Sequence, residues 1–142
     1  TGLAKDARAL IDAVLAQAPN HDYALATLGG WHGESVATVG SFLARVGTGA
    51  RKTGFVEAFE ASLKADPDNA GTRSYYARLL LDLGGKKFKR RAAEVLSEAA
   101  SIPPRNAFEV MMQTQAITLQ QTLENGDKRT LKARIKDFTP FD

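Results

Sequence analysis

The sequence contains no cysteine and only two histidines, His21 and His32. The lack of cysteine excludes disulfides, thiolate nucleophiles and cysteine-ligated zinc or iron–sulfur sites. Two histidines are too few for a histidine-rich metal site. No apolar run approaches the roughly 18 residues that span a bilayer, because Asp82 interrupts the densest stretch. We therefore expect no metal, no cofactor and no membrane-spanning segment.

The charge is unevenly distributed. Residues 1–84 carry 8 Lys/Arg and 9 Asp/Glu, whereas residues 85–142 carry 11 and 7, so the basic excess is C-terminal. Because the chain begins at Thr1 rather than at methionine, we expect that a preceding segment was trimmed. The absence of cysteine does not choose between cytoplasm and periplasm, and the localisation is left open.

Apolar residues recur at three- and four-residue steps, which is typical of amphipathic helices. We expect seven helices and no strand, and hence an all-α fold. The helix over 3–18 is predicted to turn these residues toward a core: Leu3, Ala7, Leu10, Ile11, Val14 and Ala18. The next helix, from Asp22 to Val46, is unusually long, and its predicted stripe is Leu25, Leu28, His32, Ser35, Val39, Phe42 and Val46.

The long helix also contains four glycines: Gly29, Gly30, Gly33 and Gly40. Each glycine costs about 1 kcal/mol relative to alanine in a helix interior. So many together indicate that another helix crosses closely there, or that the helix kinks.

A helix-and-proline pattern occurs three times along the chain. Its columns are Ala7, Phe55 and Ala92; Ile11, Phe59 and Leu96; Val14, Ser62 and Ala99; and Pro19, Pro67 and Pro104. The copies are offset by 48 and then by 37 residues, a spacing typical of stacked helical hairpins. We predict an α-solenoid forming one domain over 1–142. The predicted repeat units are 22–69, 70–106 and 107–138, preceded by the helix over 3–18.

The turn Asp66-Pro67-Asp68-Asn69-Ala70 and the pair Leu28-Gly29 resemble the tetratricopeptide repeat family. The segment 28–34, with Trp31, His32 and Glu34, is also similar to a Trp-His-x-Glu helix in a group of bacterial proteins with such repeats. The later repeats depart from the family pattern. The resemblance implies a right-handed stack of helical hairpins that serves as a protein-interaction or scaffold module, not as an enzyme.

In that family the partner lies in a groove lined by the first helix of each hairpin. Carried onto this sequence, the groove residues are Tyr23, Ala26, Gly30, Gly33, Ser74, Arg78, Phe108, Met111 and Gln115. Members of the family that bind the C-terminal tails of chaperones need lysine and asparagine at such groove positions. Here the groove positions carry Ala26, Gly30 and Ser74 instead, so a chaperone tail is disfavoured as the partner. We expect a protein or peptide partner. Whether the chain also forms a homo-oligomer is left open.

The alternative function is that of a small-ligand-binding or transporter-accessory protein, with a pocket near Trp31, His32 and Glu34. The competing interpretation of His32 is a neutral core residue on the apolar stripe. His-x-Glu also opens the zinc deaminase signature, but that site needs cysteines that this chain lacks. No nucleophile–base arrangement or pair of pocket carboxylates is apparent, so we predict no catalytic residues.

Five cations are predicted to occupy the opening turns of one helix, where the helix dipole is already positive: Lys86, Lys87, Lys89, Arg90 and Arg91. One interpretation is a solvated face with Asp82, Glu94 and Glu98 nearby. The other is a surface for an anionic partner, either an acidic peptide or nucleic acid. Nucleic acid is disfavoured because Phe88 is the only aromatic residue there.

The segment 47–53 comes close to a phosphate-binding P-loop. Arg51 occupies the place of the required glycine and no strand precedes it. We expect an inter-helix loop there and no nucleotide.

Overall fold

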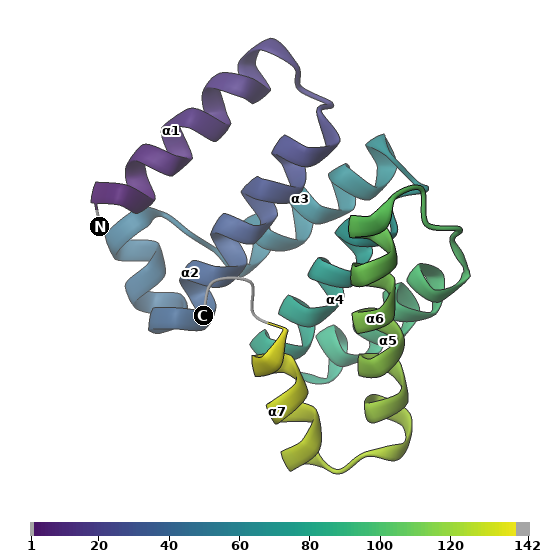
Figure 1. Cartoon of the computed structure of the whole chain (residues 1–142). Coiled ribbons are helices and arrows are strands. Elements are labelled where there is room, and N and C mark those ends of the chain that lie inside the picture. Colours follow the sequence, from purple (N-terminus) through teal and green to yellow (C-terminus); the bar gives the residue numbers. More distant parts are fainter. Residues whose placement is uncertain (1, 139–142) are drawn as a thin grey trace. The chain divides into compact units, whose positions relative to one another are not determined.

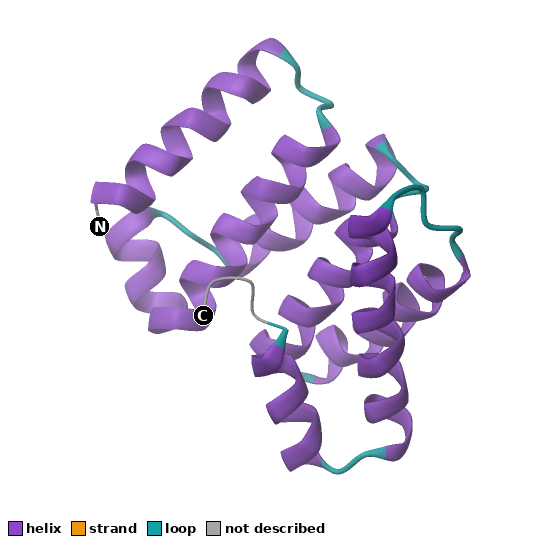
Figure 2. Cartoon of the chain, in the orientation of Figure 1, coloured by secondary structure: helices purple, strands orange, loops and turns teal. Residues whose placement is uncertain are grey.

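The computed structural model describes residues 2–138, and those residues form seven α-helices and no strand (Figure 2). The predicted all-α class and the number of helices are therefore confirmed. The helices are α1 (Gly2–Gln17), α2 (Asp22–Thr48), α3 (Lys52–Ala65), α4 (Ala70–Leu83), α5 (Lys86–Ser101), α6 (Ala107–Asn125) and α7 (Lys128–Asp137). The chain divides into two compact units, residues 1–67 and residues 68–142, here called unit 1 and unit 2.

In unit 1, α2 packs against α3 through its smallest residues. Ala26, Gly29, Gly30 and Gly33 are all buried. A Cβ atom built on Gly29 would clash with the ring of Phe59 on α3, so only glycine permits this approach. The close helix crossing predicted from the glycines is confirmed.

The predicted kink in α2 is confirmed as well, and it falls at Gly40. This residue has φ 81° and ψ 159°, a conformation that residues other than glycine rarely adopt. Beyond the kink Ala44 faces inward and is 1% exposed, whereas Phe42 is 76% exposed. The predicted inward stripe is therefore wrong at Val39, Phe42 and Val46, which are all exposed. For Phe42 and Val46 the reason is the kink, because both residues follow it.

The predicted core face of α1 is also largely wrong. Only Ile11 is buried, and Leu3, Leu10 and Val14 are exposed. In the described part of the chain α1 contacts α2 alone, so a single neighbour covers a narrow strip of its apolar surface.

In unit 2, α4 contacts α5, α6 and α7 and is buried on nearly every side (Figure 1). Side-chain caps define three helix starts, because Asn69, Asn106 and Asp127 accept backbone N–H groups of α4, α6 and α7. The largest fully buried side chains of this unit include Tyr76, Leu79, Leu80, Leu96 and Leu119.

The core positions predicted from the repeat columns are confirmed at Phe59 and Leu96, each 0% exposed. The pairs α2–α3, α4–α5 and α6–α7 fall within 22–69, 70–106 and 107–138. The boundary between the two compact units follows the first of these pairs. The grouping of all three pairs into one array stays a prediction.

Candidate partner-binding surfaces

Trp31 lies where α1 meets α2 and is held from three directions. Its Nε1–H donates to the carbonyl oxygen of Ala4 at 2.7 Å. The guanidinium of Arg8 lies 5.1 Å from the centre of its ring, and the ring of His32 meets it edge-on at 4.9 Å. The side chain of Arg8 is fixed in turn by Asp12, one turn along α1. These contacts fix the start of α1 on α2.

His32 connects α2 to the start of α3. It is 4% exposed, and its Nδ1 accepts the backbone N–H of Arg51 at 3.1 Å. A Cβ atom on Gly54 would lie 2.5 Å from its Nε2, so the ring is pressed closely against the backbone of α3. Burial, together with the charges of Arg8 and Arg51, lowers the pKa of His32 from 6.5 to about 4. At neutral pH His32 is an uncharged hydrogen-bond acceptor.

This geometry favours a packing role for His32 over a ligand-binding role. The ring of Phe59 fills the space beside Gly29, and the ring of His32 fills the space beside Gly54. These two rings thus fill space that a pocket near Trp31 would need. Glu34, one helical turn after Trp31 on α2, is half-buried. Among the described residues, no cluster of His, Cys, Asp or Glu could hold a metal ion.

The predicted groove residues differ in their access to solvent. Tyr23, Phe108 and Met111 are exposed and Gln115 is half-buried. The other five are buried: Ala26, Gly30, Gly33, Ser74 and Arg78. The guanidinium of Arg78 lies 5.4 Å from the ring centre of Tyr75 and 3.8 Å from the carboxylate of Asp82. Of the predicted groove, only these four residues are therefore accessible from solvent.

Helix α6 carries several accessible apolar side chains in unit 2. Phe108, Val110, Met111 and Ile117 are exposed, and Ala116 and Leu119 of the same helix are buried. Val110 and Ile117 share one side of α6, whereas Met111 and Phe108 project from other sides. We call these four exposed residues the α6 face.

The start of α6 is fixed by polar contacts. The buried carboxylate of Glu109 accepts the backbone N–H of Arg105 at 2.7 Å and the Arg105 guanidinium at 2.7 Å. The amide of Gln113 donates to the carbonyl oxygens of Ala99 and Ile102, at the end of α5. The α6 face is therefore carried on a well-anchored helix.

The basic residues begin α5 as predicted. Lys86, Lys87, Lys89 and Arg90 are exposed, and Gly85 supplies no side-chain cap. Arg91 differs from them, because it is half-buried and pairs with Glu94 at 3.1 Å and Glu98 at 3.6 Å.

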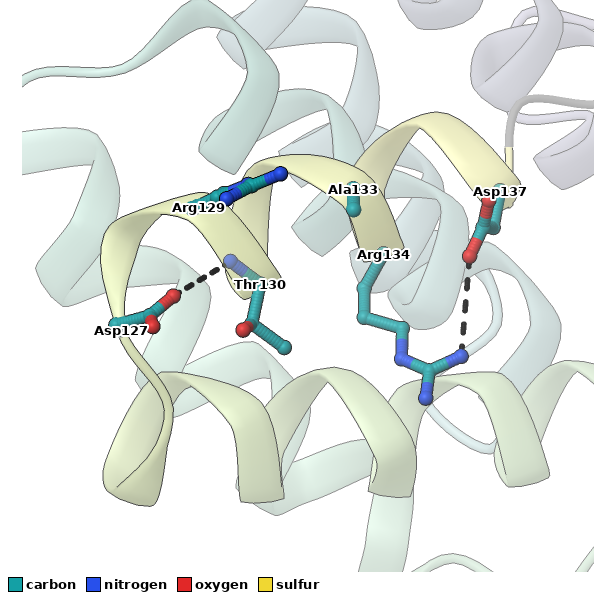
Figure 3. A pocket seen from close by; sticks show the side chains of 6 residues that line it. All are labelled: Asp127, Arg129, Thr130, Ala133, Arg134 and Asp137. Carbon is teal, nitrogen blue, oxygen red and sulfur yellow. Dashed lines mark hydrogen bonds and ion pairs between the residues drawn. The ribbon is translucent and has the colours of Figure 1, made fainter.

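A shallow hollow lies along α7 (Figure 3). Its lining residues are Asp127, Arg129, Thr130, Ala133, Arg134 and Asp137. Two internal contacts tie this lining together: Asp127 accepts the backbone N–H of Thr130 at 2.7 Å, and Arg134 pairs with Asp137 at 3.7 Å. All six residues belong to one helix and its cap, so the hollow has no opposing wall from another element among its lining residues.

Two features of the surface were not predicted from the sequence. The first is the exposed apolar group around the kink in α2, and the second is the row of cations on α7: Lys128, Arg129, Lys132 and Lys136. The signal for the second was in the sequence, since three of these lysines recur every four residues.

No protein-family model, curated protein or solved structure matches this chain. None of the helices formed by residues 2–138 is long and apolar enough to cross a membrane.

Proposed function

We propose that this chain is a protein-interaction module that binds a protein or peptide partner and carries out no catalysis. In this proposal its helical hairpins stack in the manner of tetratricopeptide repeats. The pattern of helix contacts in unit 2 supports such stacking, since α4 contacts both α5 and α6, and α5 also contacts α6. The α4–α5 hairpin thus packs on the α6–α7 hairpin through more than one helix.

The observation that carries the proposal is the α6 face. An anchored helix that leaves four large apolar side chains in solvent is typical of a surface that a partner covers. Phe108 and Met111 also belong to the groove inferred from the repeat resemblance. Aromatic residues and methionine are enriched at the centres of protein interfaces.

A photo-crosslinking residue at position 111 tests this proposal in the source cells or their extract. We expect a discrete crosslinked partner at position 111 and none at position 97, an exposed position on α5. Val110→Glu should suppress the product at position 111, because it places a charge in the apolar contact. Identical products at both positions, or a product insensitive to Val110→Glu, would contradict the proposal.

A further inference from the structure

The positively charged side chains of unit 2 are sorted into two groups. One group is neutralised by ion pairs within 4 Å: Arg73–Glu98, Arg78–Asp82, Arg91–Glu94, Arg105–Glu109 and Arg134–Asp137. The other group is exposed and makes no ion pair with any described residue. It consists of Lys86, Lys87, Lys89, Arg90, Lys128, Arg129, Lys132 and Lys136. We call these eight residues the basic end.

The eight cations come from two helices that start at the same end of unit 2. The α4–α5 connection at Gly84–Gly85 and the α6–α7 connection at Gly126–Asp127 both lie toward the lower end of this unit in Figure 1. On α7, Lys128, Lys132 and Lys136 are spaced by four residues and so share one helix face. Ile135 is buried on the inward side.

Folding of the unit does not require this arrangement. The cations of α5 begin in the first turn of a helix without a side-chain cap, where the dipole and the unsatisfied N–H groups are already positive. At the start of α7 the Asp127 carboxylate offsets part of this effect. Like charges three and four residues apart repel one another as well. A negatively charged partner would relieve both effects.

We propose that the basic end is a docking surface for an acidic segment of a partner protein. It is separate from the α6 face, and the proposal does not depend on it. Six of the eight residues are lysines, which pair with carboxylates as adaptable point charges without a fixed fork geometry. α5 and α7 make no direct contact, so a flexible acidic chain suits the basic end by reaching both helices.

Two other classes of partner fit this surface less well. Single-stranded nucleic acid is usually held by exposed aromatic side chains, and the exposed aromatic residues of the described chain lie elsewhere, at Tyr23, Phe42 and Phe108. A helix that binds a membrane surface turns apolar residues outward, whereas Leu131 and Ile135 of α7 are half-buried and buried.

The test measures binding of a fluorescent oligoglutamate peptide by anisotropy. Three variants of the whole chain are compared with wild type. One carries Lys86→Gln, Lys87→Gln and Lys89→Gln, and a second carries Lys128→Gln, Lys132→Gln and Lys136→Gln. The third is a matched control with the same charge change at exposed positions of unit 1: Lys5→Gln, Arg45→Gln and Lys64→Gln.

We expect each basic-end variant to weaken binding about tenfold and the control to remain within about twofold of wild type. Binding should also weaken as salt rises, because screening shortens the reach of exposed charges to about 8 Å at physiological ionic strength. Circular dichroism should show unchanged helix content in all three variants. The two basic-end variants alter different helices. If one of them misfolds, the other still tests the proposal.

Absence of binding to wild type would overturn the proposal, as would equal affinity of all variants. Two further probes are measured at the same ionic strength, a DNA duplex of mixed sequence and phosphatidylglycerol vesicles. Tighter, basic-end-dependent binding of either probe would assign the surface to nucleic acid or to lipid instead. Val110→Glu on the α6 face should leave peptide binding unchanged, so failure at one surface is distinguishable from failure at the other.

Discussion

The buried His32 should make unit 1 sensitive to acid. In the folded protein its pKa is about 4, against 6.5 for a solvated histidine. The unfolded chain therefore binds a proton more readily than the folded chain between these two values. The stabilising effect of neutral His32 is fully present above pH 6.5 and is lost progressively as the pH falls toward 4.

The expected size follows from the two pKa values. Linkage predicts a loss of about 2 kcal/mol in the free energy of unfolding between pH 7.5 and pH 5. The loss should approach about 3 kcal/mol below pH 4. Protonation also removes the acceptor for the Arg51 N–H and places a charge beside Arg8 and Arg51.

The assay is urea unfolding followed by the fluorescence of Trp31, the only tryptophan and a direct neighbour of His32. Carboxylates titrate in the same range, so the quantity of interest is the difference in pH dependence between wild type and His32→Asn. Asparagine keeps an acceptor near the Nδ1 position but does not titrate. His21→Asn is the control, because it preserves the acceptor that caps α2 and leaves His32 in place.

We expect His32→Asn to lack the loss of about 2 kcal/mol and His21→Asn to retain it. The reasoning is refuted if wild type and His32→Asn lose stability in parallel between pH 7.5 and pH 5. An NMR titration that placed the pKa of His32 near 6.5 in the folded protein would refute it equally.

Three further sets of substitutions test the packing, and each variant is measured by thermal and urea unfolding. Phe59→Ala and Leu96→Ala should each lower the free energy of unfolding by roughly 2–5 kcal/mol, because both side chains are fully buried. An unchanged melting temperature in both variants would mean that the repeat columns are misaligned. Gly29→Ala should cost about 1–3 kcal/mol by its clash with Phe59. Gly47→Ala meets open space and should be neutral or stabilising by up to about 1 kcal/mol, so equal effects of these two changes would contradict the close helix crossing. Gly40→Ala should cost about 1–2 kcal/mol, because alanine at φ 81° is strained, and a gain in stability would mean that the kink is absent in solution.

The number of helices, their approximate ends and the main core positions could be predicted from the sequence. Local signals determine them: apolar spacing, caps such as Asn69 and Asp127, and breakers such as Gly84 and Pro67. Glycine spacing in α2 likewise indicated a close crossing or a kink. Both occur, at different glycines, because Gly29 faces Phe59 whereas Gly40 faces open space.

Which apolar residues stay in solvent was decided only by the tertiary structure. Leu3 and Leu10 have the same helical spacing as core residues, yet α1 has a single neighbour and buries only Ile11 of its large apolar stripe. The same holds for charge. The sequence places five cations at the start of α5, but only the fold pairs Arg91 with acids and brings the start of α7 to the same end of unit 2. Periodicity determines which face of a helix is apolar, and the number and position of its neighbours decide how much of that face is buried.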